Sequence, residues 1–352
     1  MTRLKPRPRN NNMPFRGKRR KFFAAFFVFL VVGFGLWTGY LWWNLFGSAP
    51  NVGTTNMIGR AEEDTKNTAR RLIDGIKVLP IEATTTLWAV MIDNFPESRP
   101  QAGLREASLV WEAPVEGGLT RFLAVFPGVS QLERIGPIRS ARPYYIDWAQ
   151  ELGALYAHVG GSDAALEELK TGRVFDLNEF YRGQYFWRDG KRPKPYNVYT
   201  SSKLLSAAYE KEPKDIPSWI YKNEKELKDR GEPQSFKINF GKVLVEWRYN
   251  RGDNSYERLE DGLEHKDEKG SIIKAKNVVM QFVEITVLDE VGRREIKTVG
   301  RGEATILLDG ELIKGRWEKK TKNGRTRFFN ADGHEVEFNG GATWIEVVDN
   351  SM

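Results

Sequence analysis

Near the N-terminus, the 25 residues from Phe22 to Phe46 are mostly apolar and carry no charge. A helix over these residues would be about 37 Å long at about 1.5 Å per residue, and the hydrocarbon core of a bilayer is about 30 Å thick. Trp and Tyr side chains gather at its C-terminal end, where such rings favour the headgroup layer. The pattern therefore predicts a single transmembrane helix over 22–46.

The charge pattern gives this helix a direction. Residues 1–21 carry nine basic side chains and no acidic one, and basic clusters of this kind stay cytoplasmic. We expect a cytoplasmic tail over 1–21, a signal-anchor in the cell membrane, and the bulk of the chain on the extracytoplasmic side. The alternative is a cleaved signal peptide ending in Gly47–Ala49, but signal cores have only about 7 to 15 apolar residues, and Pro50 disfavours cleavage there.

Short apolar runs alternate with helical patterns in the next part of the chain. Residues 47–84 are polar and then charged, which is typical of a stalk. Over 85–225 strands and helices follow in turn, which predicts an α/β or α+β outer domain. The expected elements are a buried strand from Leu87 to Asp93, a hairpin of Ser108–Val115 and Leu119–Phe126, helices near Ser140–Leu152 and Ser201–Glu212, a strand at Ala154–Val159, and a helix over Asp163–Lys170 capped by Ser162.

The pattern changes after residue 232, where strand-like runs dominate. Asp309-Gly310 and Asp332-Gly333 are dipeptides that supply the positive φ of tight hairpin turns. The predicted fold is therefore an α+β or α/β N-terminal outer domain over 85–225, followed by a mostly-β C-terminal domain over 232–349, on a single N-terminal transmembrane helix. The expected C-terminal strands are Phe236–Phe240, Val243–Tyr249, Asn277–Asp289, Glu303–Leu308, Leu312–Lys319 and Thr343–Val348.

Composition removes several classes of function. The net charge is +7, but residues after Lys21 hold 45 basic against 47 acidic side chains, a sum of −2. The basic character thus belongs to the tail, and we expect no nucleic-acid binding by the outer domains. The chain has no cysteine, which excludes disulfides, thiol nucleophiles and a lipid-modified cysteine anchor.

Arginines are the most unusual candidate binding residues. Arg139 and Arg142, with Ser140 between them, lie at an expected helix start, where guanidinium forks and backbone N–H groups suit an anion. Arg121 lies inside an apolar strand, where an unpaired charge is costly. These residues predict an anion site. The alternative is that Glu112, Glu116 or Asp93 pairs with these arginines and braces the fold.

A glycine loop follows the strand that ends at His158. Gly160 and Gly161 lead into the helix capped by Ser162, an arrangement that resembles a strand–glycine–helix anion cradle. No lysine follows at the spacing of a phosphate-binding loop. A tight turn with a hydrogen-bonded core histidine is the alternative.

Two carboxylates are the remaining candidates. Asp93 and Asn94 end a buried strand, where ligand sites of α/β sheets form, and Glu116 lies in the hairpin turn. No cofactor is evident from motif spacing, and a divalent metal stays open through Asp93 or Glu116. An Asx turn at Asp93 and a solvated turn at Glu116 are the alternatives. His265 and Asp267 alternate in sequence, which is too few ligands for zinc, and no standard catalytic motif occurs.

Several motifs occur in order along the chain. They are Met91-Ile92-Asp93-Asn94, Arg99-Pro100-Gln101-Ala102-Gly103-Leu104, Val115-Glu116-Gly117-Gly118-Leu119-Thr120-Arg121-Phe122, Gly136-Pro137-Ile138-Arg139-Ser140-Ala141-Arg142-Pro143, His158-Val159-Gly160-Gly161-Ser162, Tyr256-Glu257-Arg258, Gly315-Arg316-Trp317 and Thr343-Trp344-Ile345-Glu346. Together they resemble the YerB-type bacterial envelope proteins, a family of two consecutive domains without a known activity. The resemblance covers roughly residues 85–348 and implies an envelope protein; some members are lipoproteins, whereas this chain lacks cysteine. Where members often read Pro-His-Asn, this chain has Pro195-Tyr196-Asn197.

A looser likeness to the LytR-CpsA-Psr phosphotransferases rests on the tail, the single helix and the order of the arginines. Three functions follow as hypotheses. The first is a module that binds an anionic envelope glycan, a lipid-linked phosphate or a partner through the arginines. The second is a metal-assisted phosphotransferase or hydrolase acting on lipid-linked glycan precursors. The third is a structural protein that docks a protein partner through exposed β edges.

Overall fold

The computed structural model of the chain describes residues 37–38, 40–41, 68–209 and 216–351. The chain divides into Met1–Lys66 and one compact unit, Asn67–Met352. The predicted tail and almost all of the predicted transmembrane helix lie outside the described residues. Within the described ranges, no helix is both long and apolar enough to cross a membrane.

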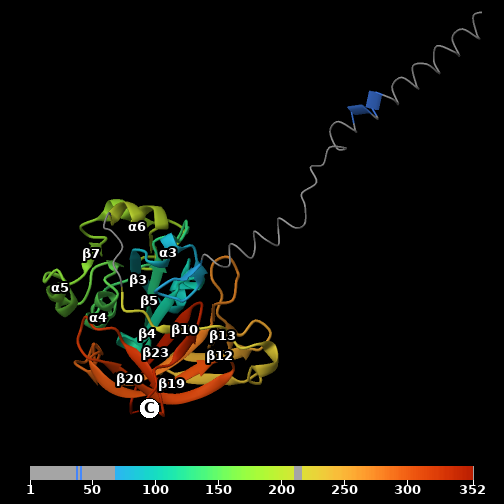
Figure 1. Ribbon diagram of the computed structural model, residues 1–352. Coiled ribbons are helices and arrows are strands. Elements are labelled where there is room, and N and C mark those ends of the chain that lie inside the picture. The colour runs from blue at the N-terminus through green and yellow to red at the C-terminus, as the bar shows by residue number, and fades with distance from the viewer. Residues whose placement is uncertain (1–36, 39, 42–67, 210–215, 352) are drawn as a thin grey trace, which may run out of the picture. The chain divides into compact units, whose positions relative to one another are not determined.

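The compact unit is organised around one ten-stranded sheet (Figure 1). Its strand order is β21-β20-β19-β16-β23-β4-β5-β3-β6-β7. Five neighbouring strands come from the N-terminal part, residues 68–209, and five from the C-terminal part, residues 216–351. Their bounds are β3 Leu87–Asp93, β4 Leu109–Pro114, β5 Thr120–Pro127, β6 Leu155–His158, β7 Phe175–Asn178, β16 Asn277–Val283, β19 Gly300–Leu308, β20 Glu311–Lys319, β21 Arg327–Asn330 and β23 Thr343–Asp349.

The two parts meet in the middle of this sheet. Strand β23, almost the last segment of the chain, pairs in parallel with β4, and the register places Glu346 opposite Glu112. Backbone hydrogen bonds therefore run without interruption from one part to the other. The red strands of Figure 1 continue directly into the blue-green ones.

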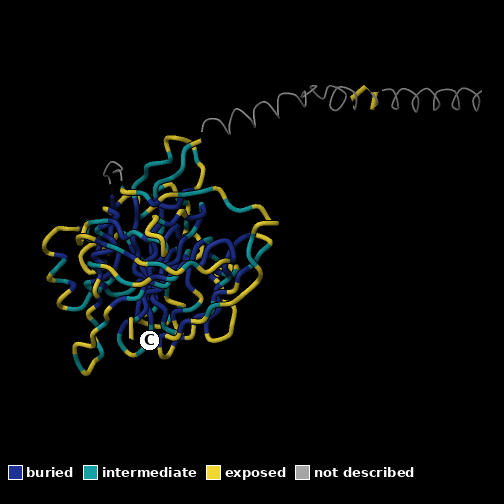
Figure 2. Tube along the Cα trace, turned by 60° about the horizontal axis from the view of Figure 1, so that its bottom comes forward, coloured by how far each residue is buried: buried dark blue, intermediate teal, exposed yellow. Residues whose placement is uncertain are grey.

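A second sheet of five strands covers one face of the large sheet. It consists of β11 Ser235–Asn239, β12 Leu244–Asn250, β13 Ser255–Glu260, β14 Leu263–Glu264 and β15 Lys274–Ala275. Successive strand residues point to opposite faces, so Leu109 and Trp111 of β4 join one hydrophobic core and Val110 joins the other. The second core also holds Trp247 of β12. Figure 2 shows this buried interior, with the exposed segments in the loops around it.

Helices of the N-terminal part lie on both faces. They are α3 Pro80–Ala83, α4 Pro143–Glu151, α5 Asp163–Leu169 and α6 Ser202–Ala208. Side chains of α4 and α5 enter the core of Trp111, and those of α6 enter the core of Trp247. Ser162 and Ser201 accept hydrogen bonds from Ala165 and Leu204 as N-caps. The cap at Ser162 and the α/β pattern of the N-terminal part are thus confirmed.

Most strand predictions are confirmed by the structure. The predicted hairpin is β4–β5, joined by the 3-10 turn η3 (Glu116–Gly118). In the C-terminal part the Asp309-Gly310 turn joins β19 to β20 with positive φ at both residues. The predicted run Asn277–Asp289 is wrong as one strand, because it divides into β16 and β17 (Ile285–Val287), which belong to different sheets.

Four two-stranded sheets complete the unit. They are β1 (Ala69–Arg70) with β2 (Lys77–Val78), β8 (Trp187–Arg188) with β9 (Val198–Tyr199), β10 (Ile220–Lys222) with β22 (Glu337–Asn339), and β17 with β18 (Arg294–Ile296). Residues 69–83 close the stretch predicted as a stalk, and they contain β1, β2 and α3, with Ile73 and Asp74 buried. The part of that stretch that the structure describes is therefore folded against the core.

Candidate functional site

The candidate site forms where two parallel strands separate. Strands β3 and β6 pair only as far as Val90 and Ala157. Beyond that point the segment Ile138–Ala141 inserts between them: Arg139 N–H donates to the Met91 carbonyl, and Val159 N–H donates to the Arg139 carbonyl. Ligand sites of open α/β sheets lie at such separated carboxyl ends. The insertion therefore brings Arg139, Ser140 and Arg142 beside Asp93.

Ion pairs connect the arginines to the predicted carboxylates. Arg139 Nε lies 3.0 Å from Asp93 Oδ2, and Arg121 Nη1 donates to the Ser140 carbonyl at 2.8 Å. Arg142 binds both oxygens of Glu116, at 2.6 and 2.7 Å. We call Asp93, Glu116, Arg121, Arg139 and Arg142 the arginine face. The alternative of structural pairing is confirmed for Asp93 and Glu116, while three cations still exceed two carboxylates.

The Arg142–Glu116 pair perturbs both of its members. Burial raises the pKa of the Glu116 carboxyl, but the hydrogen bond and positive charge of Arg142 outweigh burial and leave it below the ordinary value. Burial lowers the pKa of Arg142, and Glu116 raises it more. Both groups are therefore charged over a wide pH range, which leaves Glu116 poorly suited to carry a proton.

Arg139 is the most open member of the face. Its side chain is 27% exposed, and among the described residues neither of its η nitrogens has a hydrogen-bond partner. The guanidinium carbon lies 5.5 Å from the ring centroid of Tyr196. That ring stacks on Phe95 with centroids 5.1 Å apart and planes 9° from parallel. The face thus presents free donors beside a half-buried aromatic pair.

The predicted glycine loop uses its own polar groups internally. His158 is buried, with Nδ1 2.7 Å from the Gly160 carbonyl and Nε2 2.7 Å from Asp176. Gly160 N–H donates to Asn178 Oδ1, and Ser162 N–H donates to the Ala141 carbonyl. Gly161 forms a parallel bridge with Ala141, so the loop does adjoin the arginines. The alternative of a core histidine in a tight turn is confirmed, and the loop acts as a support for the arginine segment.

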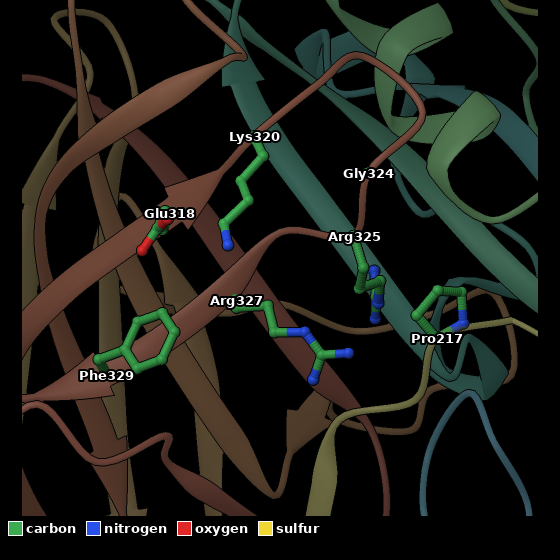
Figure 3. Close-up of a pocket in the computed structure, with 7 residues that line it drawn as sticks. All are labelled: Pro217, Glu318, Lys320, Gly324, Arg325, Arg327 and Phe329. Atoms are coloured by element: carbon green, nitrogen blue, oxygen red, sulfur yellow. The ribbon is translucent and has the colours of Figure 1, made fainter.

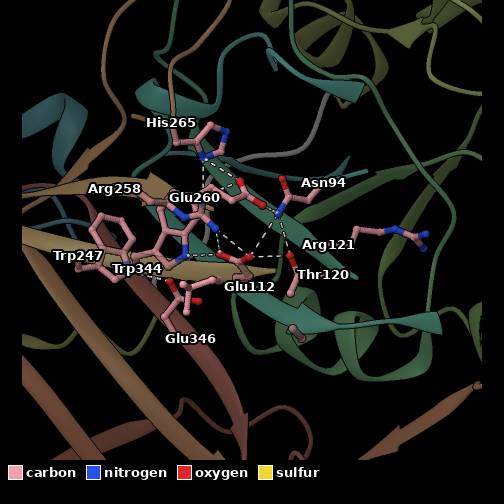
Figure 4. Close-up of polar contacts among 12 residues, drawn as sticks. Asn94, Glu112, Thr120, Arg121, Trp247, Arg258, Glu260, His265, Trp344 and Glu346 are labelled. Carbon is pink, nitrogen blue, oxygen red and sulfur yellow. Dashed lines mark hydrogen bonds and ion pairs between the residues drawn. The ribbon is translucent and has the colours of Figure 1, made fainter. Parts of the chain in front are cut away.

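Asn94 points away from the arginine face into a second polar cluster (Figure 4). Its amide donates to Thr120 Oγ1 and to Glu260 Oε1, both at 2.8 Å. This orientation does not fit a ligand role shared with Asp93. The Asx turn predicted at Asp93 is not formed, because within the described residues its carboxylate accepts no backbone N–H and binds Arg139 instead. Adjacent residues at the end of β3 therefore serve opposite faces of the sheet.

The second cluster joins the two parts of the chain through fully buried charges. Arg258 of β13 binds both oxygens of Glu112 of β4 at 2.9 and 2.7 Å, and both side chains are 0% exposed. Arg258 also contacts Glu260 at 2.9 Å. We call Glu112, Arg258, Glu260, His265 and Glu346 the buried ion network. Its members lie between the two sheets, whereas Arg121 points away from them in Figure 4.

His265 is held as a neutral ring. Arg258 Nη1 donates to Nδ1 at 2.6 Å, so Nε2 carries the proton and donates to Gln101 Oε1 at 2.8 Å. Burial, and then the charge of Arg258, hold the pKa of His265 well below its ordinary value. Burial also raises the pKa of Glu260, against the lowering effect of Arg258.

Glu346 completes the network with a third buried carboxyl group. Trp247 Nε1 donates to its Oε1 at 2.7 Å, and Oε2 has no donor among the described residues. Burial, followed by the negative charge of Glu112, raises the pKa of Glu346 well above its ordinary value. Two guanidinium groups pair with these carboxyl groups: Arg258 with Glu112 and Glu260, and Arg99 with Glu260.

Our sequence predictions did not include this network as a site. Two features of the sequence indicate the network. Tyr256, Arg258 and Glu260 are alternate residues, so they share one face of a strand, and Glu346 interrupts the apolar run from Trp344 to Val348. The pattern that singled out Arg121 was a charged residue inside an apolar strand, and Glu346 shows the same pattern.

The described residues contain no group of three or more His, Asp or Glu side chains placed to hold a metal ion. Asp93 and Glu116, the predicted metal candidates, each pair with arginine. A cation at either carboxylate would have to displace a guanidinium group.

Fold and network define a class of protein in which two consecutive sequence domains complete one sheet and enclose a shared ionic core. Residues 75–215 match the family described as "Protein of unknown function (DUF3048) N-terminal domain", and residues 236–345 match its C-terminal domain. "Putative lipoprotein YerB" of Bacillus subtilis (strain 168) is 30% identical over 298 residues, 82% of this chain and 88% of the relative. The chain belongs to this YerB-type family.

A solved structure supports the same assignment. The crystal structure of YerB protein from Bacillus subtilis matches with a TM-score of 0.72 and 29% identity, over 80% of this chain and 96% of that chain. The resemblance stated from the motifs is therefore confirmed. The family is one of unknown function, so the function has to be argued from the site.

Proposed function

We propose that this protein is a membrane-anchored, extracytoplasmic module that binds an anionic cell-envelope glycan at the arginine face. The observation that carries the proposal is Arg139, whose free η nitrogens lie beside the stacked rings of Tyr196 and Phe95. Guanidinium forks bind phosphates and carboxylates, and half-exposed aromatic rings supply apolar contact with a polar edge. A sugar that carries a phosphate or a carboxylate has both complements.

The remaining residues of the face support Arg139. Arg121 is anchored to the Ser140 carbonyl, and Arg142 is held by Glu116. These pairs fix the segment that carries Arg139, and a fixed donor loses less conformational freedom on binding. Asp93 holds Nε, so the outer edge of the guanidinium group faces the surface.

Binding is favoured over phosphotransfer by the state of the carboxylates. Asp93 and Glu116 are both engaged by arginine, and general acid–base chemistry needs a group that exchanges its proton. The enzyme hypothesis therefore becomes the alternative outcome of the test, as does the docking of a protein partner.

The location rests on the uncharged run over 22–46, the basic tail before it, and the description of the Bacillus subtilis relative as a lipoprotein. Because this chain has no cysteine, the helix takes the place of a lipid anchor. To test this topology, a reporter that works only in the cytoplasm is fused after Met352. Activity of that reporter would overturn the topology.

The function is tested with the full-length chain in non-ionic detergent. Thermal shift and calorimetry are run against N-acetylglucosamine 1-phosphate, undecaprenyl phosphate and neutral N-acetylglucosamine, with and without magnesium. Ligand binding raises the unfolding midpoint by mass action. We expect the sugar phosphate to bind, the neutral sugar to bind more weakly, and Arg139→Gln or Tyr196→Leu to lose about tenfold in affinity.

Arg248→Gln is the matched control, because it removes the same charge from an exposed strand of the five-stranded sheet. Equal losses in Arg139→Gln and Arg248→Gln would mean nonspecific charge attraction and would reject the site. Magnesium-dependent release of phosphate from either phosphate probe would favour the enzyme hypothesis. If no probe binds the wild type, a protein partner is the better hypothesis.

A further inference from the structure

A cavity of about 260 Å³ lies at the edge of the ten-stranded sheet, in the C-terminal part (Figure 3). We call it the cationic pocket. Its position is independent of both the arginine face and the buried ion network. It is lined by Pro217, Glu318, Lys320, Gly324, Arg325, Arg327 and Phe329.

The strand register explains why these side chains converge. Glu318 of β20 lies opposite Arg327 of β21, and Arg316 lies opposite Phe329. Directly opposed residues of an antiparallel pair share one face, and Lys320, two residues beyond Glu318, follows on the same side. Figure 3 shows Arg325 and Pro217 closing the other end of the cavity. The β20–β21 hairpin thus lines the cavity with charged side chains and with the ring of Phe329.

Arg325 distinguishes this pocket from an ordinary charged surface. Its side chain is only 2% exposed. Nη1 donates to Glu151 at 2.5 Å, while Nε is buried without a hydrogen-bond partner in the described part of the chain. The group lies 3.9 Å above the ring centroid of Trp219, which offsets part of the cost. A buried guanidinium group with unsatisfied donors beside a cavity is a candidate for an acceptor supplied from outside.

Arg327 and Lys320 add donors that are still available. Arg327 donates through Nη1 to the Ser218 carbonyl and to Glu335, and its other nitrogens have no hydrogen bond to a described residue. Lys320 is exposed and has no ion pair within the described ranges. Three cations therefore face one carboxylate, Glu318, in the lining. Glu151 and Glu335 lie behind the arginines as their structural partners.

We propose that the cationic pocket binds a small anion, a carboxylate or a phosphate carried on a single ring. The arginine forks and Lys320 would receive the anion, and Phe329 with Pro217 would pack against the ring. A volume of about 260 Å³ suits a small ligand, because pockets for drug-sized molecules begin at about 300 Å³. Ser218 and Trp219, which contact Arg327 and Arg325, lie at the start of the C-terminal part, so an occupant would brace the start of that part.

The test is calorimetry on the full-length chain in non-ionic detergent, with phenyl phosphate, benzoate, inorganic phosphate and acetate as probes and phenol as the neutral control. Lys320→Gln/Arg327→Gln is the test variant, because Arg325 also neutralises the buried Glu151, and its removal would threaten folding. We expect this variant to lose at least about tenfold in affinity for the preferred anion.

Two further variants keep the result interpretable. Lys237→Gln/Arg248→Gln removes the same charge from exposed strands and should bind as the wild type does. Phe329→Leu should weaken phenyl phosphate or benzoate more than inorganic phosphate or acetate. The ratio of phenyl phosphate to benzoate affinity identifies the anion.

Two results would overturn the proposal: no anion binds the wild type, or the pocket variant binds every probe as the wild type does. Equal losses in the pocket variant and in Lys237→Gln/Arg248→Gln would also reject it. Loss of sugar-phosphate binding in Arg139→Gln alone bears only on the arginine face, so the two proposals can fail separately.

Discussion

The arginine face and the buried ion network use the same side chains for different purposes. In both, arginine binds a glutamate through two hydrogen bonds: Arg142 to Glu116, and Arg258 to Glu112. The first pair is partly exposed, while the second is 0% exposed and joins the two parts of the chain. Breaking the buried pair should therefore lower the free energy of unfolding more than breaking the exposed pair, because a buried charge without its partner is far more costly than an exposed one.

The largest expected difference is in stability. Arg258→Met leaves Glu112 without its cation in a buried site and leaves Glu260 with Arg99 alone, and we expect the free energy of unfolding to fall by about 3–5 kcal/mol. Arg142→Met leaves a partly exposed Glu116 and should cost about 1 kcal/mol or less. Urea denaturation of both variants measures the difference.

A second substitution sharpens this comparison. Glu112→Gln added to Arg258→Met removes the orphaned carboxylate, so the double variant should recover part of the lost stability. Equal costs for Arg258→Met and Arg142→Met would show that burial does not separate the two regions.

The next largest expected effect is the contribution of Glu346 to the pH dependence of the free energy of unfolding. Its pKa is raised in the folded protein above the ordinary value of 4.5. The unfolded state therefore releases this proton at a lower pH than the folded state, and the free energy of unfolding falls as the pH rises above about 4.5. The slope is at most about 1.4 kcal/mol per pH unit for one proton.

Glu346→Gln mimics the protonated acid and should remove this slope. Denaturation at several pH values from 5 to about 8 compares the variant with the wild type. Glu116→Gln is the control from the arginine face, where a lowered pKa confines the loss of stability to acid pH. Parallel pH curves for wild type and Glu346→Gln would mean that Glu346 is charged in the fold.

The smallest expected effect is the contribution of His265 to the pH dependence of stability, at acid pH. Its pKa is lowered below the ordinary 6.5, so unfolding takes up a proton below that pH and stability falls as the pH falls from about 6.5 towards the folded value. His265→Gln keeps one donor and one acceptor and should flatten this part of the curve. His334→Gln, in an exposed turn, should leave it unchanged.

Nitrogen NMR provides an independent check of the same residue. The His265 ring should show one protonated nitrogen, Nε2, at about pH 6. A doubly protonated His265 at pH 6 would contradict the neutral ring that the Arg258 contact requires.

Local patterns in the sequence were enough for most of the elements. The apolar run of β3, the hairpin around Glu116-Gly117-Gly118, the Ser162 cap and the Asp309-Gly310 turn each depend on residues within a few positions of one another. The predicted site residues Arg121, Arg139, Arg142, Asp93 and Glu116 also came together, because β3 pairs with β5 so that Asp93 lies opposite Arg121, and the segment that carries Arg139 inserts beside the end of β3. Asn94 did not join them, since strand alternation sends it to the opposite face.

What the sequence determined by itself was composition, the alternation of faces and the chemistry of single residues, such as an arginine that needs a partner inside an apolar strand. Only the tertiary structure decided which partner it obtained. Glu112 and Arg258 are 146 positions apart, and Glu346 meets Glu112 because β23 returns to pair with β4. These contacts form only when the two parts of the chain fold together. No pattern among neighbouring residues can therefore predict which partners meet.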